Sequence, residues 1–152
     1  MRDILKRSWW KLPVFLLSAG WLSFLLMANV LGRRAVITLA DGTLSHDPVL
    51  WQQLHAIPLA LTLLAGFLLF RKTSRRDLLC SAAVSSALMA VFSLLSLTRI
   101  YAFAWLSSLM IYWADFCCTY LFKLLSAGWL YTVATWCLPF IFVLFGRKNA
   151  EH

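Results

Sequence analysis

The amino-acid sequence predicts an all-α integral membrane protein with four transmembrane helices and one amphipathic helix on the outer face. Its 152 residues are 62% hydrophobic and 13% charged, whereas soluble domains are about 25% charged. The apolar residues form runs of roughly twenty residues, enough for a helix to cross about 30 Å of hydrocarbon. Short clusters of Lys and Arg separate these runs, a distribution that is typical of multi-pass membrane proteins.

Four apolar segments are predicted to cross the membrane, at about residues 12–31, 48–70, 78–97 and 126–145. Trp9 and Trp10 precede the first segment, and tryptophans at this position anchor helices at membrane interfaces. Asp47 directly before a proline is typical of a helix start, and Pro58 is expected to bend the second helix or to start its deeper part. We expect these segments to form a single membrane domain over residues 1–152.

The longest polar loop, residues 32–47, contains a signal for a β-hairpin. Asp41 and Gly42 lie between β-favouring residues, and an Asp-Gly pair suits a type I′ turn because both central positions need positive φ. Pairing about this turn would place Leu39 opposite Leu44. The alternative interpretation is a flexible connector.

Positive charge predicts the orientation of the chain in the membrane. If four segments span and both termini are cytoplasmic, most of the 14 Lys and Arg residues lie on the inner side, in agreement with the positive-inside rule. A chain with five spans satisfies the rule slightly less well. We expect a multi-pass protein of the plasma membrane, of the bacterial cytoplasmic type. Membrane lipids with acidic headgroups, not nucleic acid, are the expected partners of the basic clusters.

The third predicted helix, residues 78–97, is rich in small side chains. Ala82, Ser86 and Ala90 recur at intervals of four residues, and small residues at this spacing allow two helix backbones to approach closely. We expect this stripe to pack the helix at the centre of the bundle. An interface between copies of the chain is the alternative.

Residues 103–125 are predicted to form the amphipathic helix. Polar residues recur at intervals of three and four on one face: Ser108, Tyr112, Asp115, Thr119, Lys123 and Ser126. Apolar residues occupy the opposite face, so the helix would lie flat at the outer interface or enter it shallowly. In the alternative with five spans the segment crosses the membrane. Asp115 would then lie near the midplane, where a carboxylate costs roughly 2.5–3.5 kcal/mol and is commonly functional.

Five residues are candidates for a functional role: Asp115, His55, Arg99, Lys123 and Gln52. Gln52 and His55 are i, i+3 neighbours on the second predicted helix, and acids, histidines and arginines are the types that acid–base chemistry uses. The sequence contains no GxSxG, HExxH, P-loop or GxGxxG motif, so no catalytic residue is assigned. Its three histidines match no haem or zinc pattern, and neither a metal nor a cofactor is expected.

Three functional hypotheses follow from these observations. The first is a non-enzymatic accessory, assembly or interaction subunit of a membrane complex, whose partner is another membrane protein or a second copy of the chain. The second is a small oligomeric transporter or channel subunit in which Asp115 lines a polar path. The third is a membrane enzyme with an outer-face site near Asp115, His55 and Arg99. We favour the first because the chain lacks a substrate motif and a set of cofactor ligands.

Overall fold

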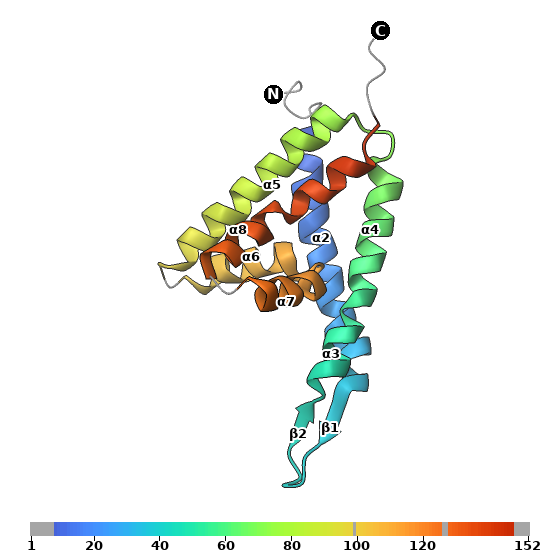
Figure 1. Cartoon of the computed structure of the whole chain (residues 1–152), viewed down its shortest axis with the longest axis vertical. Coiled ribbons are helices and arrows are strands. Elements are labelled where there is room, and N and C mark those ends of the chain that lie inside the picture. The colour runs from blue at the N-terminus through green and yellow to red at the C-terminus, as the bar shows by residue number, and fades with distance from the viewer. Residues whose placement is uncertain (1–7, 99, 126–127, 148–152) are drawn as a thin grey trace.

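Four long apolar helical segments organise the chain (Figure 1). A computed structural model describes residues 8–98, 100–125 and 128–147, and 82% of these described residues are helical. The four segments that are long and apolar enough to cross a membrane are Lys11–Ala35, Pro48–Phe70, Arg75–Ser96 and Gly128–Phe145. They agree with the predicted spans to within a few residues at each end. The prediction of an all-α chain with four such helices is therefore confirmed.

The elements follow one another in a simple order. They are η1 (Ser8–Trp10), α2 (Lys11–Leu26), η2 (Met27–Leu31), η3 (Gly32–Ala35), β1 (Val36–Thr38), β2 (Leu44–His46), α3 (Pro48–Leu54), α4 (Ala56–Phe70), α5 (Arg75–Ser96), α6 (Tyr101–Tyr112), α7 (Asp115–Leu124), α8 (Gly128–Cys137) and η4 (Leu138–Phe145). The hairpin β1–β2 lies at one end of the molecule, beyond α3, and the turn between α4 and α5 lies at the other (Figure 1).

The hairpin differs from the predicted one by a single residue of register. Thr38, not Leu39, pairs with Leu44. The N–H of Gly42 donates to the carbonyl of Leu39 at 2.9 Å, so the turn is centred one residue earlier than Asp-Gly. Gly42 has a φ of 81°, as in a three-residue loop that ends with a glycine bulge. Hydrogen bonds from the Thr43 hydroxyl and backbone to the Asp41 carboxylate hold the pKa of that carboxyl below its usual range.

The last apolar segment reaches spanning length through a change of helix type. Pro139 lies at the start of η4, where its missing N–H ends the α-helical hydrogen-bond ladder. The chain continues as a 3₁₀-helix, which rises about 2.0 Å per residue instead of about 1.5 Å. The 18 residues of α8 and η4 therefore extend about 31 Å, although a purely α-helical segment of this length would be shorter.

α5 contacts α2, α6, α8, η1 and η4, so it packs against the first and last spans and against α6. Ala82 is fully buried, and the half-buried Ser86 donates its hydroxyl to the carbonyl of Trp136. The Ser81 hydroxyl donates to the Trp9 carbonyl at 2.6 Å and accepts the N–H of Leu12 at 3.1 Å. These bonds satisfy polar groups at the start of α2, where a helix has no partners of its own.

The prediction of one amphipathic helix over residues 103–125 is wrong in one respect, because the structure has two helices there, α6 and α7. After Trp113 the N–H of Ala114 bonds to the Ile111 carbonyl at 2.7 Å, which tightens the ladder and ends α6. With 12 and 10 residues, the two helices are about 18 and 15 Å long. Neither can cross a membrane alone, so the described residues do not form the alternative with five spans.

The break between α6 and α7 lies inside the bundle rather than on its surface. Trp113 and Ala114 are buried and belong to the main hydrophobic core, together with Leu12, Leu16 and Phe142. The rings of Trp113 and Phe142 have centroids 5.4 Å apart. The segment therefore enters the bundle with α6, turns at its core and leaves with α7. In contrast to a flat surface helix, it is held from several sides.

Candidate functional site

Four of the five predicted functional residues meet where α7 contacts the junction of α3 and α4. His55 Nε2 lies 3.5 Å from Asp115 Oδ2, and Lys123 Nζ donates to Gln52 Oε1 at 3.4 Å. We call these four residues the α3–α7 polar cluster. The fifth candidate, Arg99, lies outside the described residues. The sequence identified these residue types, and the fold brings together positions 55 and 115, and positions 52 and 123, which are 71 residues apart.

Pro58 creates the backbone geometry at the centre of the cluster. It has no N–H to offer the Leu54 carbonyl, and the helix is interrupted at His55, where α3 ends and α4 begins. The His55 N–H bonds to the Gln52 carbonyl at 3.2 Å instead of the Trp51 carbonyl. The released Trp51 carbonyl is 2.9 Å from His55 Nδ1. A carbonyl can only accept, so Nδ1–H donates to it, and Nε2, which faces Asp115, attracts the carboxylate only when it also carries a proton.

Aromatic rings enclose the His55 imidazole, which is only 2% exposed. Its centroid lies 5.4 Å from that of Trp51 and 5.7 Å from that of Tyr112. Burial, and then the nearby Asp115 carboxylate, raise the pKa of Tyr112 above its usual value, so this phenol stays neutral. The Asp115 side chain is 46% exposed. The pair thus joins a buried ring to a carboxylate that is open to the surroundings.

The charges of the cluster also suit the helix that carries them. Asp115 is the first residue of α7, and Lys123 lies in its last turn. An acid at the start and a base at the end of a helix complement its dipole. Lys123 Nζ lies 5.6 Å from the centroid of the Tyr120 ring, within the range of a cation–π contact. The positions of Asp115 and Lys123 therefore also stabilise α7 itself.

One side chain of the cluster has an unused donor. Gln52 Nε2 is buried and has no hydrogen-bond partner among the described residues, which is a costly state for an amide. No three His, Cys, Asp or Glu side chains lie close enough to hold a metal ion in the part of the chain that the structure describes. The arrangement can hold polar groups by hydrogen bonds and exchange a proton between imidazole and carboxylate.

Two residues of the site were not assigned to it from the sequence. Trp51 and Tyr112 flank the His55 ring, and Tyr112 appeared only as a member of the polar stripe. The spacing Trp51–His55 is i, i+4, which places the two side chains on one helical face. That spacing directly before Pro58 was the available signal. No signal pointed to Tyr112 because its approach depends on the break after α6.

α7 also carries the two adjacent cysteines. Cys118 is buried in the core cluster, and Cys117 is half-buried. Burial raises the pKa of the Cys117 thiol. Burial first, followed by the charges of Asp115 and Cys117, raises the pKa of the Cys118 thiol to about 12. Both are described as free thiols.

We expect Cys118 to resist maleimide labelling. With a pKa of about 12, only about one thiol in ten thousand is ionised at pH 8, and the thiolate is the reactive form. In detergent, a variant whose single cysteine is Cys118 should stay unlabelled by N-ethylmaleimide over a time in which the variant retaining only Cys80, which is exposed, reacts fully. Equal labelling rates for the two variants would contradict the burial of the Cys118 side chain.

No protein-family model matches the chain, and neither a curated protein nor a solved structure matches it.

We expect the His55–Asp115 contact to stabilise the fold by about 0.5–1 kcal/mol when both imidazole nitrogens carry protons, because one partner is half exposed and solvent weakens such pairs. A double-mutant cycle with His55→Phe and Asp115→Asn, followed by unfolding in detergent, measures this coupling. The control cycle pairs His55→Phe with Asp77→Asn, at the opposite end of the molecule, and should give no coupling. Equal coupling in both cycles would mean that the 3.5 Å contact has no energetic role.

Proposed function

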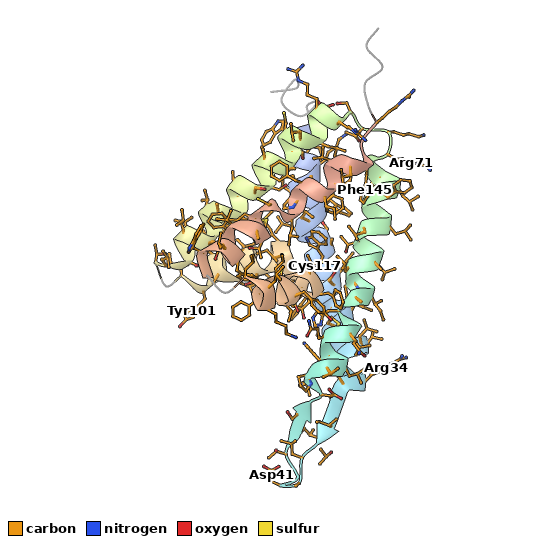
Figure 2. All side chains as sticks on the ribbon, viewed as in Figure 1. Arg34, Asp41, Arg71, Tyr101, Cys117 and Phe145 are labelled. Carbon is orange, nitrogen blue, oxygen red and sulfur yellow. The ribbon has the colours of Figure 1, made fainter. Side chains whose placement is uncertain are left out.

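We propose that the protein is inserted in the plasma membrane with four spans and with both termini on the cytoplasmic side. Large apolar side chains on its long helices point outward, among them Leu22, Leu64 and Leu94 with 64%, 56% and 61% exposure. Exposing so much apolar surface to water is unfavourable, whereas contact with lipid is favourable. The end opposite the hairpin carries a basic group of Lys11, Arg71, Lys72, Arg75, Arg76 and Arg147 (Figure 2 labels Arg71). This end is the cytoplasmic one under the positive-inside rule.

Within that membrane, the protein acts as a non-enzymatic interaction subunit whose recognition element is the hairpin. The observation that carries this proposal is the position of β1 and β2 beyond the helices, with Asp41 at the far tip (Figure 2). Val36, Ile37 and Leu44 are 39%, 41% and 74% exposed. A two-stranded hairpin is marginally stable alone, and both of its edges leave backbone groups that another strand can pair with.

The α3–α7 polar cluster serves this function as a clamp. α3 carries the hairpin, and it joins α4 at the bend that Pro58 produces. His55–Asp115 and Gln52–Lys123 attach this bend to α7, whose start is held in the core by Trp113 and Ala114. Two contacts on neighbouring turns restrict rotation of α3 more than one contact would. The clamp therefore fixes the direction in which the hairpin leaves the bundle.

We expect Leu44→Asp to release the protein from its complex without unfolding it. A side chain 74% exposed contributes within about 0.5 kcal/mol to stability, whereas a carboxylate opposes burial at an apolar interface. Blue-native electrophoresis of gently solubilised membranes measures the complex. The control is Ala40→Asp, which adds the same charge at the loop without removing apolar surface. Migration of the unaltered protein as a lone monomer would contradict the proposal.

A second candidate function, proton or small-cation transport by an oligomer, draws support from the His55–Asp115 pair. A carboxylate beside a buried imidazole inside a membrane bundle is a common element of proton relays. In proteoliposomes with a pH-sensitive dye, this function requires proton flux that Asp115→Asn abolishes and Leu44→Asp leaves unchanged. Absence of flux in the unaltered protein would exclude proton conduction and leave the interaction subunit.

A further inference from the structure

An apolar groove runs between α2 and α4, on the part of the molecule that would face lipid. Its volume is about 280 Å³ and it is open on one side. One face of α2 lines it with Phe15, Ser18, Ala19, Leu22, Ser23 and Leu26, and one face of α4 lines it with Pro58, Leu61, Thr62 and Ala65. The groove therefore follows two helical stripes instead of a loop, and both walls belong to elements with regular backbone.

The groove exists because small residues face each other while larger ones keep the helices apart. Ser18 and Ala19 on α2 lie opposite Thr62 and Ala65 on α4, and side chains of this size would let two helices close. Toward the basic end, however, the ring of Phe142 fills the notch at Gly66. Phe142 also packs edge-on against Phe15 and Phe70, with centroids 5.5 and 6.1 Å apart. These aromatic rings keep α2 and α4 from packing directly against each other.

Two further contacts join the elements beyond the other end of the groove. The indole of Trp51 packs against Gly32, where even a methyl group would collide with it. The rings of Phe24 and Tyr112 lie with centroids 5.6 Å apart, beside the His55 ring. Aromatic contacts thus hold the two helices beyond each end of the groove.

We propose that this groove holds one hydrocarbon chain of an anionic phospholipid; the proposal rests on the membrane insertion argued above. The cations at the basic end of the groove favour a lipid over a second protein helix. A slender acyl chain fits, and the lining offers it almost entirely carbon. The groove is thus a lipid site between two spans, not a docking surface for another helix.

Charge at the basic end identifies the headgroup. Lys11 lies one turn before Phe15 on α2, and Arg71 and Lys72 follow Phe70 at the end of α4. All three cations are exposed, and they flank the end of the groove where the headgroup of an inserted chain would lie. Asp77 is the one acidic side chain near this end among the described residues, and it lies at the start of α5. A phosphodiester with a net negative charge complements this arrangement.

Native mass spectrometry of the full chain tests the proposal, after extraction from carbonate-washed membranes into mild detergent and addition of phosphatidylglycerol or phosphatidylcholine with identical chains. We expect one phosphatidylglycerol per chain, retained about tenfold more strongly than phosphatidylcholine because two or three cations contact it. Ser18→Phe and Ala65→Phe, from opposite walls, should each lower retention about tenfold by filling the groove. Leu64→Phe adds the same ring outside the groove and should change nothing.

The outcomes separate this proposal from membrane insertion itself. Loss of the chain from carbonate-washed membranes would contradict insertion, whereas a membrane-embedded chain without lipid retention would overturn only the lipid site. Lys11→Gln with Arg71→Gln should abolish the preference for phosphatidylglycerol, and a preference that persists would overturn the headgroup assignment. A dimer that Ser18→Phe dissociates would replace the lipid with a second copy. If either groove variant fails to fold, the other variant and the comparison of the two lipids still test whether the groove binds lipid.

Discussion

Replacing Trp113 with alanine is expected to lower the free energy of unfolding by about 3–5 kcal/mol, the usual cost of removing a buried aromatic ring. Trp113 is 2% exposed and is the largest fully enclosed side chain near Phe142. Its loss leaves the neighbouring core atoms without contacts on one side. It also removes the bond from its indole N–H to the Met110 carbonyl, 2.9 Å long. Both effects act at the turn between α6 and α7, so this segment should detach first.

The control for Trp113→Ala is Trp129→Ala, which removes the same ring from a position 69% exposed. The control should change stability by no more than about 0.5 kcal/mol. Chemical unfolding in detergent, followed by circular dichroism, gives both values. Protease cleavage between α6 and α7 would show whether the segment opens locally. Similar stabilities for the two variants would mean that the turn does not lie in the core.

Gly20→Leu is expected to have the second large effect, a loss of at least about 3 kcal/mol, at the upper end of the cost of overpacking. The reason is that α2 and α6 cross at Gly20 with their backbones in contact. A Cβ atom at this position would coincide with the carbonyl oxygen of Leu109. A flexible side chain could move away, but a backbone carbonyl inside a helix cannot do so without displacing α6. The variant must therefore separate the two helices or unfold.

Gly128→Ala provides the comparison for Gly20→Leu. Nothing lies within 4 Å of a Cβ at Gly128, and alanine reduces the conformational freedom of the unfolded chain, so stability should stay equal or rise by up to about 1 kcal/mol. Thermal unfolding in detergent measures both variants. If Gly20→Ala also unfolds the protein while Gly128→Ala does not, the contact of α2 with α6 is confirmed as a backbone contact. Normal stability of Gly20→Leu would exclude that crossing.

The candidate site was predictable in its residues but not in its geometry. Asp115, His55, Gln52 and Lys123 were recognisable because polar residues are rare in an apolar chain. Their meeting was not predictable, because it depends on where α7 lies relative to the bend at Pro58. The hydrogen bond of His55 Nδ1 uses the Trp51 carbonyl at the junction of α3 and α4, and no pattern of spacing encodes that contact.

The polar stripe over residues 103–125 keeps its helical spacing although the helix is broken between α6 and α7. The stripe continues in step through Trp113 and Ala114, so the sequence indicates a single helix. In the structure the Trp113 ring is enclosed by the core, and the Ser107 hydroxyl bonds to Ser93 on α5 at 2.8 Å. These tertiary contacts hold α6 in a direction that α7 cannot continue. The break therefore reflects packing between helices and not the local preference of the two residues.

The sequence by itself determined the four long apolar helices, the cap at Asp47, the bend at Pro58 and the existence of a turn near Gly42. Each of these depends on residues within a few positions of one another and on the length of an apolar run. Only the tertiary structure decided the buried turn of α6 and α7, the clamp between His55 and Asp115, and the groove between α2 and α4. These features depend on side chains far apart in sequence, whose shapes must fit before their contacts exist.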